Sequence, residues 1–300
     1  MSGATGRVAV SLGRHCTRVA SLGALLAGAA GGLAVPGANA QAPVADPAPQ
    51  IWLGPDGQPL PLESEADVLE FLRTAEVVSR EKTSDGITRP EKLLLEADGV
   101  QAHAIFRTFE RELRRTRRPD GRYYVRWVDH YGGECAAYEL ARRLGLGLVP
   151  PTVSRRLGAN DGSVQLWIEG NRDETDPDFV VRSPIAWMKQ QWDMILFDNL
   201  ILNVDRNANN TLVDPDDHLW LIDHTRAFQP KAELLDPERL QKVNRVFWDR
   251  LQSMSDEELK DVVRDHVALD QMTALVERRA LLAERVQALV DEHGEAAVFY

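Results

Sequence analysis

The segment from Asp198 to Phe228, DNLILNVDRNANNTLVDPDDHLWLIDHTRAF, constrains this chain more than any other part. It carries Asp205, then Asn210 five residues later, and then Asp223 at the end of a short apolar run. Phosphoryl transfer to a hydroxyl needs a carboxylate to orient the acceptor, and oxygen ligands for the metal ion that bridges the phosphates. An Asp-x-x-x-x-Asn loop followed by a later Asp supplies these groups in the order that kinases use.

Two structural alternatives compete with this interpretation. Segments rich in Asp and Asn often form turns, because their side chains bond to the nearby backbone. A calcium loop is the other alternative, since Asp205, Asn207 and Asn209 fit the start of an EF-hand loop. However, Asn210 replaces the required glycine, Asp216 replaces the twelfth-position Glu, and the sequence that follows is β-like. The calcium alternative is therefore excluded, whereas the turn remains open for this segment taken alone.

The flanking sequence adds a family resemblance. DRNANN followed by LIDHTRAF resembles the catalytic and metal-binding loops of atypical kinases, the phosphatidylinositol 3-/4-kinase-like, HipA-like and secreted Fam20-like group. Those families carry Asp-Arg-His-x-x-Asn and then Asp-x-Gly-x-x-Phe, whereas this chain has Asn207 and Thr225 in place of His and Gly. The resemblance covers roughly residues 75–300 and is specific within 198–228. It implies an α+β, two-lobed protein-kinase-like fold, with a small β-rich N-terminal lobe and a mainly helical C-terminal lobe.

The resemblance also implies roles for individual residues. Asp205 would be the catalytic base, Asn210 and Asp223 would hold Mg or Mn, and ATP would be the cofactor. Arg107, in AIFRTF, stands where these kinases place a phosphate-binding lysine, and no lysine occurs between residues 92 and 189. Arginine binds phosphate in a bidentate manner. A surface arginine on an edge strand is the structural alternative for this position.

Two further residues belong to the expected nucleotide site. Either Glu134 or Glu139 of a predicted helix could pair with Arg107, and the position in the resembling families favours Glu134. A hairpin loop centred on Gly86 could place backbone N–H groups over the phosphates, because glycine permits close approach. An ordinary turn is the alternative for Gly86.

Residues 1–40 have the layout of a secretory signal peptide. Three arginines and His15 precede an apolar stretch from Val19 to Val35, and Ala38-Asn39-Ala40 supplies a cleavage site before Gln41. An uncleaved membrane anchor is the alternative, although the stretch is short and rich in glycine for a span. We therefore expect a secreted or periplasmic protein with no stable membrane insertion after cleavage.

Charge and cysteine content exclude a nucleic-acid-binding protein and a disulfide-stabilised fold. Removal of residues 1–40 removes three arginines and no acidic residue, so the formal net charge changes from −11 to −14. Such an acidic chain lacks the excess of basic residues that proteins use to bind nucleic acid. Only Cys135 remains after processing, so no internal disulfide can form.

The rest of the chain suggests a domain plan. Residues 41–60 are rich in Pro, Ala and Gly and predict a flexible linker. Residues 61–168 would form a nucleotide-holding lobe containing a helix capped by Ser64 and several strands, the last two joined by a turn at Gly162. Residues 169–300 would form the catalytic lobe, beginning with a helix capped by Ser183, and Ser255 would open a later helix with a capping box. The basic run 111–118 is expected to be a solvated loop with no role.

These patterns predict an exported, kinase-like protein that transfers a phosphoryl group from ATP to a protein or small-molecule hydroxyl acceptor. A non-catalytic nucleotide- or protein-binding module on the same fold is the rival from a different class. Arg107 in place of lysine favours the rival, because the substitution would mark lost activity. The low ATP content of a bacterial periplasm also favours it.

Overall fold

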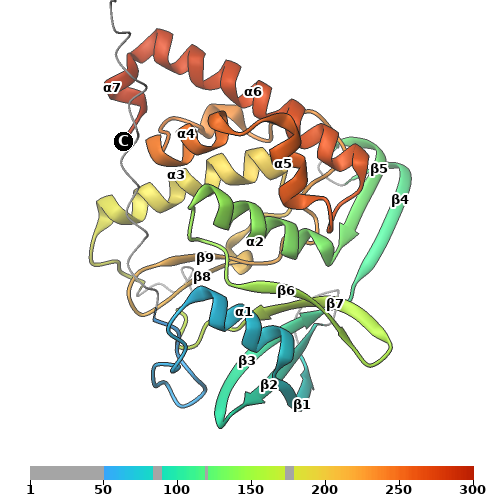
Figure 1. Cartoon of the computed structure of the whole chain (residues 1–300). Coiled ribbons are helices and arrows are strands. Elements are labelled where there is room, and N and C mark those ends of the chain that lie inside the picture. Colours follow the sequence, from blue (N-terminus) through green and yellow to red (C-terminus); the bar gives the residue numbers. More distant parts are fainter. Residues whose placement is uncertain (1–50, 84–89, 119–120, 173–178) are drawn as a thin grey trace, which may run out of the picture. The chain divides into compact units, whose positions relative to one another are not determined.

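The computed structural model describes residues 51–83, 90–118, 121–172 and 179–300, all within the compact unit Asp46–Tyr300. The expected signal peptide and Gly86 lie outside the described residues. Among the described residues, seven strands and two helices precede residue 170, and a mainly helical part follows (Figure 1).

The N-terminal part is built on a five-stranded antiparallel sheet in the order β1-β2-β3-β7-β6. Helices α1 (Glu65–Thr74) and α2 (Gly132–Leu144) pack against one face of this sheet (Figure 1). The strands are β1 (Glu76–Lys82), β2 (Glu91–Ala97), β3 (Val100–Arg107), β6 (Thr152–Leu157) and β7 (Asn160–Leu166).

Alternation along β3 divides its side chains between two faces. Ala104 and Phe106 belong to the core formed with α1 and α2, so Ile105 and Arg107 point to the opposite face. Ser163 of β7 lies directly beside Arg107 in the sheet register and shares that face. The sheet thus presents polar side chains away from its helices.

The turn between β6 and β7 differs from the sequence expectation. It falls at Gly158, whose φ of 67° suits glycine, and not at Gly162. Gly162 lies inside β7, where an added Cβ would come within 2.5 Å of the carbonyl oxygen of Arg107. Its role is therefore close approach of two strands, which a sequence pattern cannot distinguish from a turn.

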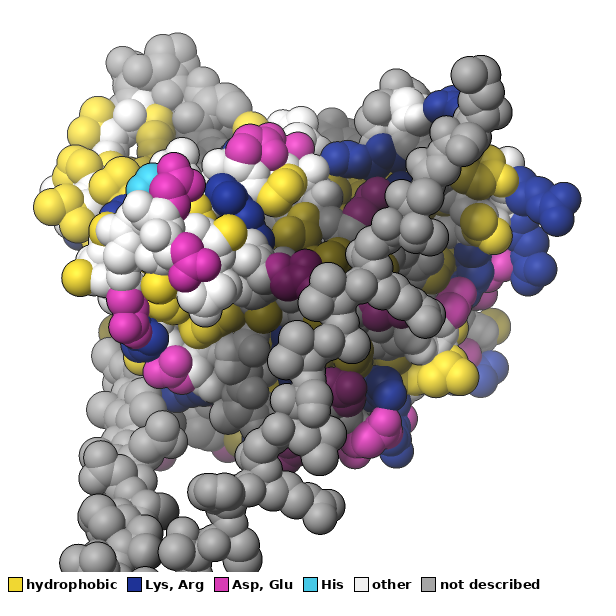
Figure 2. All heavy atoms as spheres, turned by 90° about the horizontal axis from the view of Figure 1, so that it is seen from above, with side chains coloured by type: hydrophobic (Ala, Val, Ile, Leu, Met, Phe, Trp, Pro, Cys, Tyr) yellow, Lys and Arg dark blue, Asp and Glu magenta, His cyan; other side chains and the backbone are white. Residues whose placement is uncertain are grey.

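The basic run 111–118, expected to be a solvated loop, is mostly a strand. Residues 110–117 form β4 (Glu110–Arg117), which pairs with β5 (Tyr123–His130) in a separate two-stranded sheet. Buried Trp127 and Tyr124 on β5 give the hairpin an apolar side that packs against the protein. The right-hand edge of Figure 2, the side on which β4 and β5 lie in Figure 1, carries a group of basic side chains.

The C-terminal part consists of helices around a short hairpin. Ser183 caps α3, and Ser255 forms the expected capping box at α5. The helices are α3 (Pro184–Ile201), α4 (Arg245–Ser253), α5 (Asp256–Val263), α6 (Leu269–His293) and α7 (Glu295–Val298). The hairpin is β8 (Thr211–Val213) with β9 (Leu219–Leu221), and two short 3-10 helices cover Ala208–Asn210 and Pro237–Arg239.

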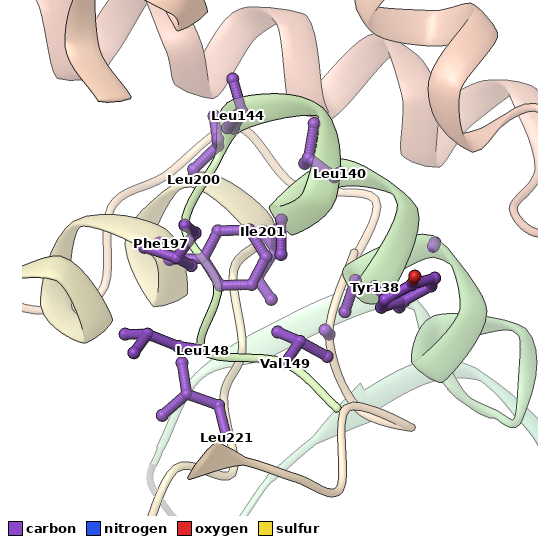
Figure 3. Close-up of a cluster of buried hydrophobic side chains, with 14 of the residues drawn as sticks. Tyr138, Leu140, Leu144, Leu148, Val149, Phe197, Leu200, Ile201 and Leu221 are labelled. Carbon is purple, nitrogen blue, oxygen red and sulfur yellow. The ribbon is translucent and has the colours of Figure 1, made fainter. Parts of the chain in front are cut away.

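One continuous core joins the two parts. Figure 3 shows Leu140 and Leu144 of α2 beside Leu200 of α3, with Phe197 and Leu221 below them, and all five side chains are buried. The N-terminus of α2 lies against the segment that follows β9, since an added Cβ at Gly133 would be 2.3 Å from the carbonyl oxygen of His224. None of the described helices is long and apolar enough to cross a membrane.

Candidate active site

The pairing of β8 with β9 brings Asn210 and Asp223 together. Thr211 lies opposite Leu221 in this hairpin, and Ile222 N donates to Asn210 O at 3.1 Å. Asn210 is therefore beside the residue that precedes Asp223. The loop that carries Asp205 begins where α3 ends, at Leu202 in the left-handed region with φ 48°. The hairpin and the end of α3 thus deliver the sequence-predicted residues to one place.

The loop around Asp205 is closed by its own amides. Asn210 Nδ2 donates to Asp205 O at 2.8 Å, and Asn207 Nδ2 donates to the same oxygen at 2.9 Å. The turn expected from Asx-rich segments is therefore present. It coexists with the functional interpretation, because donation through Nδ2 leaves the Oδ1 atom of Asn210 as the group available to a ligand.

Asp223 occupies a strained and partly buried position. Its φ of 55° lies in the left-handed region, which Asp and Asn tolerate better than other non-glycine residues. Burial raises the pKa of Asp223 above its usual value, the charge of Arg107 opposes this, and the charges of Glu134 and Asp205 raise the pKa further. The carboxylate thus bears an electrostatic cost in the free protein that a bound cation would relieve.

Arg107, Glu134 and His224 form a buried cluster next to Asp223. Arg107 Nε lies 3.3 Å from Glu134 Oε1, and His224 Nδ1 lies 3.4 Å from Glu134 Oε2. Desolvation opposes ionisation of Glu134, but the charge of Arg107 and the contact with His224 outweigh it and lower its pKa to about 2. Within the described residues, Arg107 Nε and Nη1 and both Glu134 oxygens are buried without a formed hydrogen bond.

The alternative partner, Glu139, is directed elsewhere. It pairs with Arg142 on the surface of α2, at 3.5 Å. Arg107 is buried and is therefore not the exposed edge-strand arginine of the structural alternative.

Arg206 ties the two loops of the site together. Its Nε and Nη2 donate to the carboxylate of Asp198 at 2.9 and 3.2 Å. Its Nη1 donates to Asn210 O and, at 2.9 Å, to Ile222 O, and its Nη2 lies 3.0 Å from His224 Nε2. One planar guanidinium thus fixes the Asp205 loop relative to the segment that carries Asp223.

Arg226 connects Asp205 to the β4–β5 hairpin. Its Nη1 donates to Asp205 Oδ2 at 2.9 Å, and its Nε donates to Asp129 Oδ2 at 2.8 Å. Asp129 lies near the end of β5 and is almost fully buried. The side chain of Asp205 is therefore held from outside its own loop.

Sequence reasoning missed four of these residues. Arg206 and Arg226 lie inside the quoted motif and could have been noticed as the arginines beside Asp205 and Asp223. His224 carried no signal, because a single histidine after a carboxylate has no fixed role. Ser163 is fully buried, and no described residue contacts its Oγ through a hydrogen bond; only the sheet register reveals that it adjoins Arg107.

The raised pKa of Asp223 predicts that Asp223→Asn stabilises the free protein. An acid whose pKa rises on folding binds its proton more tightly in the folded state than in the unfolded state. The folded state therefore loses stability as pH rises from 3.8 through the raised pKa, where the carboxyl group ionises. We expect the variant to be more stable than the wild type at pH 7, with a higher Tm, and equally stable near pH 3. Asparagine tolerates the left-handed φ of this position, so the substitution adds no backbone strain. A variant with a lower Tm than the wild type at pH 7 would contradict the prediction.

No family model and no curated protein matches the chain. Solved structures do match. Hydra Fam20 with sugar aligns with a TM-score of 0.58 at 15% identity, covering 79% of this chain and 93% of that chain. Golgi casein kinase with Mn/ADP bound aligns at 0.54 and 15% identity, covering 78% of each chain, and a second structure of the Golgi casein kinase aligns at 0.52. The α+β, two-lobed kinase-like fold expected from the sequence is thereby confirmed.

Proposed function

We propose that this chain is an ATP-dependent phosphotransferase that acts on a hydroxyl of a protein or small-molecule acceptor. The observation that carries the proposal is the buried Arg107–Glu134 pair, 3.3 Å apart, beside Asp223. Burying ionised groups is costly, and Arg107 retains donors without a hydrogen bond in the part of the chain described here. A phosphate group would satisfy those donors.

The residues present fit a metal–nucleotide complex. Magnesium is usually held by one or two protein oxygens together with substrate phosphates. Asp223 and Asn210 offer one carboxylate and one amide oxygen, and in the described ranges no three His, Cys, Asp or Glu side chains form a metal site by themselves. The solved Golgi casein kinase with Mn/ADP bound supports this assignment, because it has the same fold. When bound, Mg or Mn would neutralise charge on the phosphates.

Each side chain then has a definite task. Arg107, held by Glu134, would bind phosphate oxygens, and buried Ser163 beside it would donate a further hydrogen bond. Asp205 would orient the acceptor hydroxyl and take its proton, as general bases do. Arg226 would keep the Asp205 carboxylate directed, through its second bond to Asp129.

A non-catalytic binding module is the second candidate. Two observations favour it: arginine replaces the expected lysine, and the Asp205 carboxylate is already engaged by Arg226 at 2.9 Å. Both candidate functions include nucleotide binding, so only an assay of phosphoryl transfer distinguishes them.

Thermal unfolding with ATP, with and without Mg²⁺ or Mn²⁺, tests the shared part. Ligands that bind only the folded state stabilise it, by about 2.7 kcal/mol at a hundred times the Kd. We expect a Tm increase that requires both ATP and metal, and that is absent from Asp223→Asn. A wild type whose Tm ignores ATP with either metal would refute nucleotide binding.

We also propose that the protein is exported and that it begins at or near Gln41 after cleavage. The support is the Ala38-Asn39-Ala40 site behind a short apolar stretch. Mass spectrometry of the protein recovered outside the cytoplasm should give a mass that starts at Gln41. Recovery of the chain with residues 1–40 intact would contradict cleavage.

A further inference from the structure

His224 lies between the two halves of the proposed site and is fully buried. Its Nε2 is 3.0 Å from Nη2 of Arg206, and its Nδ1 is 3.4 Å from Oε2 of Glu134. A guanidinium can only donate hydrogen bonds, so Nε2 must accept. The ring proton therefore sits on Nδ1, which lies near the Glu134 carboxylate without a formed hydrogen bond.

The contact is also fixed by the backbone. Gly133, one residue before Glu134, lies so close to His224 that an added Cβ would be 2.3 Å from the carbonyl oxygen of His224. The N-terminus of α2 is thus pressed directly against the Asp223–Thr225 segment.

His224 completes a continuous series of polar contacts from the catalytic loop to the sheet. The series runs through the carboxylate of Asp198, the guanidinium of Arg206, the imidazole of His224, the carboxylate of Glu134 and the guanidinium of Arg107. Four of these side chains are at most 7% exposed, and that of Arg206 is 11% exposed. Glu134 joins His224 to Arg107 through its two carboxylate oxygens.

We propose that His224 is a positioning residue for nucleotide binding: it fixes the Glu134 carboxylate, and Glu134 in turn directs Arg107 at the phosphates. This inference rests on the proposed function. An apolar residue at this place would leave Glu134 Oε2 and Arg206 Nη2 each without the contact they now have. Burial makes such losses costly, because a desolvated polar group has no water to replace its partner.

Two variants separate the two contacts of the ring. In His224→Asn, the amide reaches the place of Nδ1, so it keeps the donor for Glu134 and gives up the contact with Arg206. In His224→Gln, the amide reaches the place of Nε2, so it keeps the acceptor for Arg206 and gives up the donor for Glu134. Both variants are polar and of similar size, which preserves folding.

Calorimetric titration with ADP plus Mn²⁺, and Tm in parallel, is the test. We expect His224→Gln to weaken the affinity about tenfold, and His224→Asn to stay within about twofold of the wild type. His218→Asn is the matched control. His218 lies on the β8–β9 turn and makes its hydrogen bond to Gly147 O, so its substitution should leave the affinity unchanged.

A double-mutant cycle with Arg107→Met gives a second readout. If His224 acts through Glu134 on Arg107, the losses from His224→Gln and Arg107→Met overlap, and the double variant binds no worse than Arg107→Met. Additive losses, or equal affinity losses in the Asn and Gln variants, would overturn the positioning role. A wild type that does not bind Mn–ADP would instead refute the proposed function itself, so the two failures are distinguishable.

Discussion

Asp205→Asn is expected to lower the rate of phosphoryl transfer by about 10²–10⁴-fold while leaving the affinity for metal–nucleotide nearly unchanged. Asparagine keeps the size of the side chain and can still accept from Arg226, but it cannot take the proton of an acceptor. The loss therefore falls on the transition state and not on ground-state binding. Transfer of labelled phosphate from ATP to the protein itself, or to an extract of exported proteins, measures the rate.

Two comparisons make this result specific. Asp216→Asn carries the same substitution onto an exposed position of the β8–β9 turn and should leave the rate unchanged. Asn210→Ala should lose transfer and nucleotide affinity together, because its amide is assigned to the metal. An active wild type whose rate survives Asp205→Asn would mean that the base lies elsewhere. A wild type that binds metal–ATP without transfer, to itself or to any protein of the extract, would favour the binding module.

Glu134→Ala should produce the largest loss of stability of any single substitution in the site. The carboxylate is fully buried beside Arg107, and removing it leaves a buried guanidinium without a counter-charge, which costs about 3–5 kcal/mol. The lowered pKa of Glu134 agrees with this, because a fall from 4.5 to about 2 on folding corresponds to about 3 kcal/mol. The Tm should fall by roughly 6–20 °C.

The pH dependence of this stability follows from the direction in which folding shifts the pKa of Glu134. A depressed carboxyl pKa gives stability that is present above the unfolded value of 4.5 and is lost as pH falls toward 2. Urea unfolding of the wild type should therefore show this loss between pH 4.5 and 2, and Glu134→Gln should not. Glu139→Ala, on the same helix but in a surface pair with Arg142, is the control, with an expected cost of about 0–1 kcal/mol.

A paired replacement separates stability from binding. Arg107→Met combined with Glu134→Leu removes both buried charges at similar volume, and such replacements are often neutral or stabilising. We expect the double variant to have a Tm near that of the wild type, unlike Glu134→Ala, and to show no metal-dependent ATP binding. Wild-type ATP affinity in this double variant would show that the pair is only structural.

The sequence predicted those parts of the fold that depend on local chemistry. The capping residues Ser64, Ser183 and Ser255 are followed by helices, because a side-chain oxygen satisfies the backbone donors of the first turn. The hairpin after Asn210 followed from two short β-like apolar runs, Thr211–Val213 and Leu219–Ile222. These signals act over a few residues, so the pattern alone contains them.

Other features depend on contacts that are remote in the chain. The basic run 111–118 reads as a loop because exposed arginines dominate it, whereas β4 is held by pairing with β5 and by the apolar side of that partner strand. Gly162 reads as a turn, although what requires glycine there is the nearby backbone of Arg107. Tertiary contact overrides local preference at both positions.

The candidate site shows the same division. Asp205, Asn210 and Asp223 could be proposed from spacing in one segment, and the roles assigned to them stay predictions. Ser163 and His224 could not be proposed, because their significance comes from neighbours on β3 and α2. Arg107 and Glu134, on β3 and α2, could be proposed only because the family resemblance pointed to their positions.

The hairpin of β4 and β5 has a consequence for movement between the lobes. It leaves the sheet after β3, yet Val128 exchanges two hydrogen bonds with the side chain of Gln229, and His130 N donates to Thr225 O at 2.8 Å. The hairpin thus connects the two lobes in addition to the core that α2 shares with the C-terminal helices. A rigid rotation of one lobe against the other must break these bonds or carry the hairpin with it, so nucleotide exchange at the proposed site would be coupled to these bonds if it needs such a rotation.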